Sequence, residues 1–211
     1  MTVQTIFSML LFIAFIIYSQ IGVRILPHRK NAPINKVILA ICVAMSFWSL
    51  GFSLANSAGS YESALLWRRF SAIGWGMIFA LLLHFVLVVL ERTGNFQKKW
   101  YFGFLYLPAI ASVIAFGLHP GIAAGQYNLI HTSTGWFNQS INNYIDWLFN
   151  SYFISYTLIS LVLIVYARQK ATAINRHVTE LILLTVAATF VITTSTDVIL
   201  SIYFPGNVPQ I

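Results

Sequence analysis

Six apolar runs, each long enough to cross a lipid bilayer as a helix, divide this chain almost from end to end. They cover about residues 3–25, 38–57, 64–90, 100–118, 144–166 and 181–204. A membrane-spanning helix needs about 20 mostly apolar residues, and its backbone hydrogen bonds close within the helix itself. Charged residues make up only 8% of the chain, whereas a soluble domain carries about 25%. The sequence therefore predicts an all-α, multi-pass membrane bundle that forms a single domain over residues 1–211.

The net charge of +7 comes from basic residues that gather in alternate loops. All but two of the 12 Lys and Arg residues lie at or beyond the ends of the first, third and fifth runs: Arg24, Arg29, Lys30, Lys36, Arg92, Lys98, Lys99, Arg168, Lys170 and Arg176. Arg68 and Arg69 alone lie on the opposite side. Basic loops stay in the cytoplasm, so we expect the amino terminus outside the cell. The charge then reflects membrane topology and contact with the lipid bilayer, and it does not indicate nucleic-acid binding.

The longest connection, residues 119–143, lies on the outer side in this topology. Its Gly, Asn, Ser and Thr content predicts a folded extracellular cap, with a small hairpin around residues 133–135. Trp136 and Phe137 should then pack onto the helix ends or sit in the interface. Six spans that start outside also finish outside, so we expect a seventh helix and a longer parent protein.

His84 lies in the middle of the third apolar run and is a candidate functional residue. Ionisable side chains are costly in hydrocarbon, although histidine can stay neutral. It shares one helix face with Trp67, and with Gly74, which leaves a notch for a neighbouring helix or a ligand. Two interpretations stay open: an imidazole hydrogen-bonded to another helix, and a contact to a ligand or a proton.

The sixth run carries a polar face built from residues four apart: Thr189, Thr193, Asp197 and Ser201. Lipid is a poor neighbour for such a face. One hypothesis has the guanidinium of Arg68 or Arg69 reach Asp197 and close the outer end of a cavity. The alternative is that both arginines extend to lipid headgroups while threonines satisfy Asp197.

The fifth run adds Tyr152, Tyr156 and Ser160, a row that could face the polar side of the sixth run. Together with Trp48 and Trp75, this row would form an aromatic, sparsely polar pocket of the kind that binds small molecules. Packing between helices is the competing explanation. Candidate ligand-binding residues are thus His84, Asp197, Arg68, Arg69, Trp67, Trp75, Trp48, Thr193, Tyr152 and Tyr156.

Motifs for catalysis are missing from the sequence. It has no phosphate-binding or dinucleotide glycine loop, no paired carboxylates and no histidine spacing typical of a metal site. Every lysine lies in a loop, so no buried amine is present for a retinal Schiff base. We therefore expect neither a cofactor nor a metal, and no catalytic residue in this chain.

Several stretches resemble a known membrane family. They are Trp48-Ser49-Leu50-Gly51 at the end of the second run, Trp67-Arg68-Arg69 and His84-Phe85 in the third, and "TDVILSIYFPGNVPQI" at the end. These resemble the seven-helix sensor region at the amino terminus of bacterial histidine kinases and of some diguanylate cyclases. The resemblance implies a bacterial inner-membrane location, a seventh helix beyond residue 211, and a cytoplasmic output region through which two copies form a homodimer.

The function we expect is that of a receptor domain for a small, partly hydrophobic ligand or for the state of the membrane. A ligand among the third, fifth and sixth helices would shift their packing and bias the output domain. Two other classes stay open, namely a transporter or permease subunit and a structural membrane subunit without a ligand.

Replacing Asp197 with Asn tests the paired-charge hypothesis. If an arginine pairs with this carboxylate, the Asp197→Asn protein should unfold more easily or signal differently, because a buried guanidinium loses its counter-charge. Thermal unfolding and output activity are the two measurements. Unchanged behaviour in both would contradict the pairing.

Overall fold

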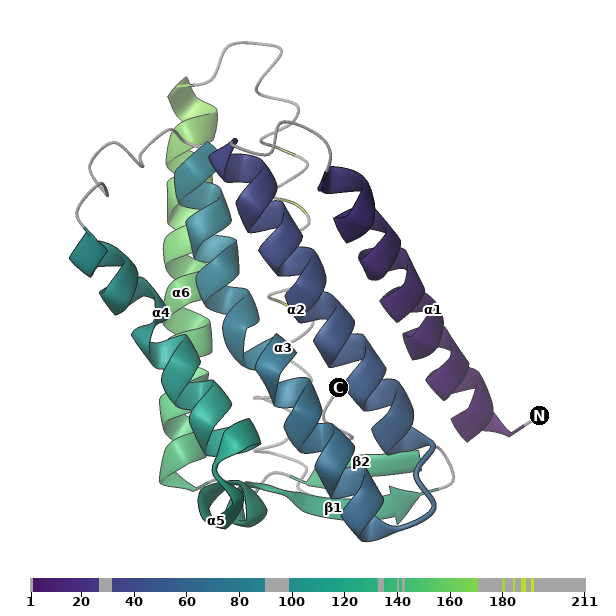
Figure 1. The fold of residues 1–211 in the computed structure, drawn as a ribbon. Helices are drawn as coiled ribbons and strands as arrows, with labels where there is room; N and C mark the ends of the chain where they lie inside the picture. Colours follow the sequence, from purple (N-terminus) through teal and green to yellow (C-terminus); the bar gives the residue numbers. More distant parts are fainter. Residues whose placement is uncertain are drawn as a thin grey trace.

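The computed structural model describes residues 2–26, 32–89, 99–132, 135–139, 141, 143–170 and the single positions 180, 184, 187, 188 and 191. Its long helices are α1 (Val3–Ile25), α2 (Pro33–Asn56), α3 (Tyr61–Val89), α4 (Lys99–Val113) and α6 (Tyr144–Lys170). The shorter elements are a π-helical turn η2 (Ile114–Leu118), α5 (Pro120–Ala123), a 3-10 turn η3 (Ala124–Gln126), and strands β1 (Asn128–Thr132) and β2 (Gly135–Gln139). The long helices stand side by side, with the hairpin across one end (Figure 1).

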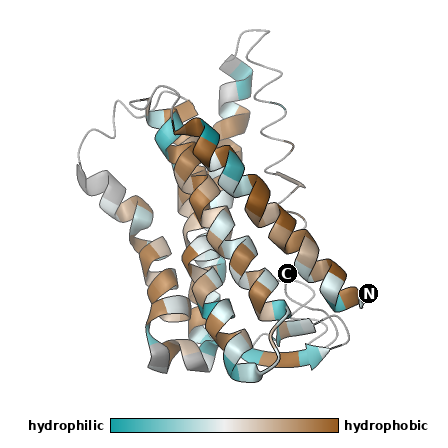
Figure 2. Cartoon of the chain, turned by 45° about the vertical axis from the view of Figure 1, so that its right-hand side comes forward, coloured by the Kyte–Doolittle hydropathy of each residue, from teal (hydrophilic) through white to brown (hydrophobic). Residues whose placement is uncertain are grey.

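Within the described residues, four helices are long and apolar enough to cross a membrane: α1, α2, α3 and the segment Tyr144–Tyr166 of α6. A shorter apolar helix, Gly103–Leu118, corresponds to the fourth predicted span. Hydrophobic residues run along these helices, whereas polar ones gather at their ends and in the hairpin (Figure 2). The multi-pass helical prediction is confirmed for these segments. The sixth predicted span, 181–204, falls almost wholly outside the described residues.

Pro33 corrects one predicted boundary. The second apolar run was predicted at about residues 38–57, and helix α2 begins earlier, at Pro33. Proline suits the first position of a helix, because the amide hydrogen that it lacks would have no partner within the helix.

Helix α3 is the centre of the bundle. It packs against α2, α4, η2 and α6, while α1 packs mainly on α2. The α2–α3 contact is unusually close at Gly74, where an added Cβ would lie 2.6 Å from the amide nitrogen of Trp48 and overlap the carbonyl of Ala44. Small residues permit such contacts between membrane helices. A neighbouring helix therefore fills the notch that the sequence indicated at Gly74.

Helix α4 carries Pro108 in its interior and continues into the π-helical turn η2. Proline lacks an amide hydrogen and interrupts the regular hydrogen-bond ladder, and π-turns in helices often lie at functional sites. Gly117 in this turn lies so close to α3 that an added Cβ would be 3.0 Å from the carbonyl oxygen of Arg69. The irregular end of α4 is thus fitted against the first half of α3.

The predicted hairpin is confirmed. Strands β1 and β2 pair antiparallel, with Thr132 opposite Gly135. Trp136 packs onto the helix ends, where its indole Nε1–H donates to the carbonyl of Ala58 at 2.8 Å, and Phe137 is buried. The hairpin contacts α2 through β2 and α3 through β1, so it forms a cap over the ends of both helices.

Gly74→Ala tests the close α2–α3 contact. The added methyl group should destabilise the bundle by about 1–3 kcal/mol, because two backbones must separate to admit it. Gly103→Ala is the matched control, since an added Cβ there meets nothing within 4 Å. Thermal unfolding of the purified protein in lipid nanodiscs measures the difference. Equal stability of the two variants would contradict the packing described here.

Candidate functional site

The guanidinium of Arg68 lies buried in α3, beneath the hairpin. The residue is only 4% exposed, its Nη2 donates to the carbonyl of Trp136 at 2.7 Å, and its Cζ lies 3.9 Å from the ring centroid of Phe52. Its Nε has no hydrogen-bond partner among the described residues. Among the described residues, no carboxylate lies within ion-pair distance of the Arg68 guanidinium. Arg68 is thus a buried cation that joins α3 to the hairpin.

Arg69 points to a different element. Its Nε donates to the carbonyl of Gly117 in η2 at 3.1 Å. Tyr127, which directly precedes β1, donates its hydroxyl to the carbonyl of Phe116 in η2 at 3.0 Å. Burial raises the pKa of the Tyr127 hydroxyl, which keeps it protonated and able to donate. The adjacent arginines therefore attach α3 to two elements, the hairpin and η2.

These contacts differ from both sequence hypotheses for the arginines. Each guanidinium donates to a backbone carbonyl of the protein, and sequence reasoning considered only headgroups and Asp197 as partners. Backbone carbonyls leave no mark in a sequence pattern, which explains the omission. Asp197 and Thr193 lie outside the described residues, so the proposed pairing with Asp197 stays a prediction.

His84 makes an inter-helix hydrogen bond. Its Nδ1 lies 2.7 Å from the hydroxyl oxygen of Tyr106 on α4, and the two rings meet edge to face at 5.9 Å. This contact matches the structural interpretation of His84. Tyr106 was not among the predicted site residues, because nothing in its sequence spacing relates it to the third span.

The hydroxyl of Tyr152 bonds the backbone of α3. It accepts from the amide of Ala80 at 3.0 Å and donates to the carbonyl of Gly76 at 3.2 Å. These two backbone groups are four residues apart, the spacing of a backbone hydrogen bond within the continuous helix α3. Tyr156 donates to the carbonyl of Leu105 on α4 at 3.1 Å. In the described structure the hydroxyls of Tyr152 and Tyr156 thus bond α3 and α4, and whether this row also faces the sixth span stays a prediction.

The tryptophans divide between separate aromatic groups. Trp75 packs edge to face against Phe116 and Phe149, with centroids 5.1 and 4.9 Å away. Trp48 packs against Phe52 of its own helix at 6.1 Å. Trp67 packs against Phe70 at 5.5 Å. The described structure therefore links Trp75 through Phe149 to Tyr152 and Tyr156, while Trp48 and Trp67 belong to other aromatic groups.

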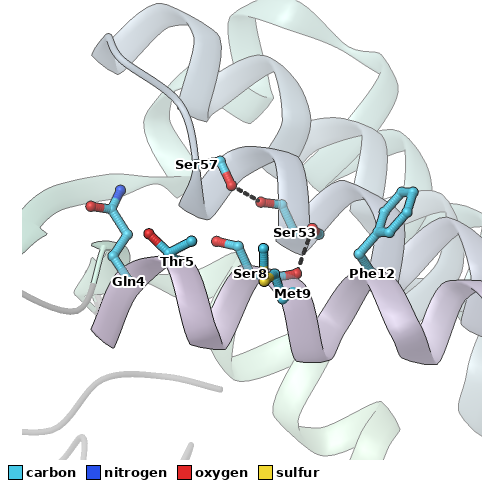
Figure 3. Close-up of a pocket in the computed structure, with 7 residues that line it drawn as sticks. All are labelled: Gln4, Thr5, Ser8, Met9, Phe12, Ser53 and Ser57. Atoms are coloured by element: carbon cyan, nitrogen blue, oxygen red, sulfur yellow. Dashed lines mark hydrogen bonds between the residues drawn. The ribbon is translucent and has the colours of Figure 1, made fainter. Parts of the chain in front are cut away.

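A polar seam between α1 and α2 was missed by sequence reasoning. Asn56 is 2% exposed, and its Nδ2 donates to Ser8 Oγ at 3.0 Å, while Gln4 Nε2 donates to the Asn56 carbonyl at 2.7 Å. Ser53 adds a bond to the Ser8 carbonyl at 2.8 Å. Beside this seam lies an open groove of about 450 Å³ (Figure 3). The signal was present in the spacing of Gln4 and Ser8, and of Ser53 and Ser57, each four residues apart.

Comparison with known families decides the assignment. The family model described as the N-terminal 7TM region of histidine kinase matches residues 5–208. The chain belongs to this family. No curated protein and no solved structure matches it. The resemblance drawn from the second, third and sixth runs is therefore confirmed, and this histidine kinase 7TM region is a multi-pass membrane domain of signal transduction.

In this histidine kinase 7TM region, the described polar contacts are arranged along α3. Arg68 and Arg69 attach its hairpin-end half to the cap and to η2, Tyr152 attaches its middle to α6, and His84 attaches its opposite half to α4. No group of three or more His, Cys, Asp or Glu side chains that could hold a metal occurs among the described residues. The arrangement is suited to transmitting movement between helices.

Gly135→Ala tests how firmly the cap of the 7TM region is seated. Gly135 has a φ of +120° and lies against Asn56, so that an added Cβ would overlap Oδ1 of that side chain. We expect a loss of at least about 1 kcal/mol of stability and faster proteolysis of the hairpin, from backbone strain and displacement of the cap. Gly125→Ala, where an added Cβ meets nothing within 4 Å, is the control. Similar rates of hairpin proteolysis in both variants would contradict the close contact between Gly135 and Asn56.

Proposed function

We propose that this chain is the signal-sensing domain of a bacterial sensor histidine kinase in the cytoplasmic membrane. It detects a small, partly hydrophobic ligand or the state of the membrane, and it relays the signal to a cytoplasmic output domain. The family match supports the sensor class over the transporter or permease subunit and over the ligand-free structural subunit. In the complete protein, two copies would join through the output region.

The proposed orientation puts the hairpin outside the cell. Arg24 at the end of α1, Lys36 at the start of α2 and Arg168 near the end of α6 all belong to the helix ends away from the hairpin. Basic residues favour the cytoplasmic side of a membrane. The cap and the buried Arg68 would then meet ligands that arrive from outside or from the outer leaflet.

The observation that carries the proposal is the environment of Arg68. A buried charge is costly unless hydrogen bonds and an opposite charge compensate it. Here the guanidinium is stacked on Phe52 and bonded to the Trp136 carbonyl, while Nε is left without a described partner. A ligand group that accepts a hydrogen bond would compete with the Trp136 carbonyl, or with Asp197, for this cation. The aromatic surroundings favour a ligand that is apolar elsewhere.

Helix α3 would carry the signal inward. From Arg68 to His84 it spans about 24 Å, at about 1.5 Å for each residue. Over that length it bonds α6 through Tyr152 and α4 through Tyr106. A ligand that releases the cap from Arg68 would favour a second arrangement of α3 among these neighbours. The switch requires that the ligand bind the two arrangements with different affinity.

Substitution of Arg68 tests the proposal in the complete kinase, reconstituted in liposomes. Arg68→Gln should change basal autophosphorylation by about threefold or more, because loss of the charge shifts the balance between capped and released states. Arg68→Lys should give an intermediate autophosphorylation rate, since lysine keeps the positive charge but lacks the planar guanidinium group.

Arg24→Gln, at an exposed position on the opposite end, is the control and should keep the wild-type rate. If Arg68→Gln does not fold, Trp136→Phe keeps an aromatic ring, removes the indole bond to Ala58 and loosens the same cap. A wild-type rate in every folded cap variant would rule out a signalling role for this contact.

A further inference from the structure

The groove between the hairpin-end halves of α1 and α2 has a polar lining without any charged side chain (Figure 3). Its volume is about 450 Å³. The polar side chains are an amide and four hydroxyls, from Gln4, Thr5, Ser8, Ser53 and Ser57. A lining of this kind selects against ions, which would lose water without gaining a counter-charge. It suits an uncharged polar group.

The polarity of the groove changes along α1. Gln4 lies at one end and Phe12 at the other (Figure 3). Over these eight residues, about 12 Å of helix, the lining passes from amide and hydroxyl groups to Met9 and Phe12. Met9 is 50% exposed and Phe12 is 44% exposed, so both can contact an acyl chain. The groove thus has the gradient of an amphiphile lying parallel to the helices, with its head at the hairpin end.

The hydrogen bonds within the seam leave oxygen acceptors open. Ser57 Oγ donates to the Ser53 carbonyl at 2.9 Å, and Ser53 Oγ donates to the Ser8 carbonyl at 2.8 Å. Gln4 uses its amide nitrogen toward Asn56, and no described residue donates to its Oε1. The hydroxyl hydrogens of Ser53 and Ser57 are therefore engaged with backbone, whereas the lone pairs of Ser53, Ser57 and Gln4 can still accept. A ligand that donates hydroxyl hydrogens complements this set.

We propose that this groove binds the head of an uncharged, hydroxyl-bearing amphiphile of the monoacylglycerol type. The head donates to the open oxygens of Gln4, Ser53 and Ser57, and the chain runs along Met9 and Phe12. The ligand enters from the leaflet at the hairpin end. This site is separate from Arg68, and its occupancy is independent of the proposed sensing role. A bound head would hold α1 against α2 beside Asn56, which supports the hairpin at Gly135.

Photolabelling tests the site directly. The full chain is placed in phosphatidylcholine nanodiscs with a monoacylglycerol that carries a diazirine in its chain, and labelled peptides are mapped by mass spectrometry. We expect labelling concentrated in the groove-facing residues of α1 and α2. Unlabelled monoacylglycerol should compete about fivefold better than the fatty acid or its methyl ester, a ratio that corresponds to about one hydrogen bond.

Met9→Trp places a larger side chain in the groove and should reduce labelling about fivefold or more, because it takes up space that the bound amphiphile needs. Leu10→Trp places the same bulk on an exposed neighbour outside the lining and should label like the wild type. If Met9→Trp does not fold, Ser57→Leu removes an acceptor and adds bulk at an exposed position.

Three results would overturn the site: equal labelling of folded Met9→Trp and Leu10→Trp, equal competition by the methyl ester, or labelling spread over the exposed faces of α1 and α4 as for bulk lipid. Absence of labelling, as when another helix covers the groove, overturns it as well. None of these measurements uses kinase output, so their failure leaves the role of Arg68 to its own test.

Discussion

Hydrocarbon offers no hydrogen bonds, so every polar group at membrane depth must find its partner inside the protein. This constraint explains most of the polar contacts described here. The Tyr152 hydroxyl bonds the backbone of α3, His84 pairs with Tyr106, and Asn56 is held by Gln4 and Ser8. Each of these bonds joins two helices, because a side chain that reaches out of its own helix meets a neighbour. The hydrogen bonds that satisfy these polar groups therefore also hold the helices together.

The constraint acts most strongly on α3, which combines close backbone contacts with inter-helix hydrogen bonds. Gly74 brings α2 near, and Gly117 of η2 approaches the same helix from the other side. Arg68 adds a cation whose described bond partner belongs to the cap. A helix bound on several sides cannot move alone, so displacement at the hairpin is felt by α2, α4 and α6 together. This arrangement is consistent with the role of the 7TM region in signal transduction.

The sequence was informative where the signal is local. Apolar run length predicted the spans, and Gly135 with its polar neighbours predicted the hairpin, because both depend on residues close in the chain. Pairings across helices were not predictable in the same way. Tyr106, the Trp136 carbonyl and the Gly117 carbonyl carry no pattern that relates them to His84 or to the arginines. The bonds of the tyrosine row to α3 and α4 were not predictable either, since helical spacing shows which residues share a face but not which helix that face meets. The polar seam of α1 and α2 had a readable spacing that was overlooked.

The position of Tyr152 has a further consequence for how α3 and α6 can separate. While the hydroxyl is seated, the amide of Ala80 and the carbonyl of Gly76 bond to tyrosine oxygen. Both groups lie in a continuous α-helix, at the spacing of its own backbone hydrogen bonds, so each can keep a partner within α3 when the hydroxyl withdraws. The main free-energy cost of separating α3 from α6 at this point is then the loss of hydrogen-bond partners for the Tyr152 hydroxyl. Helices α3 and α6 can therefore separate at this point with little loss of backbone hydrogen bonding.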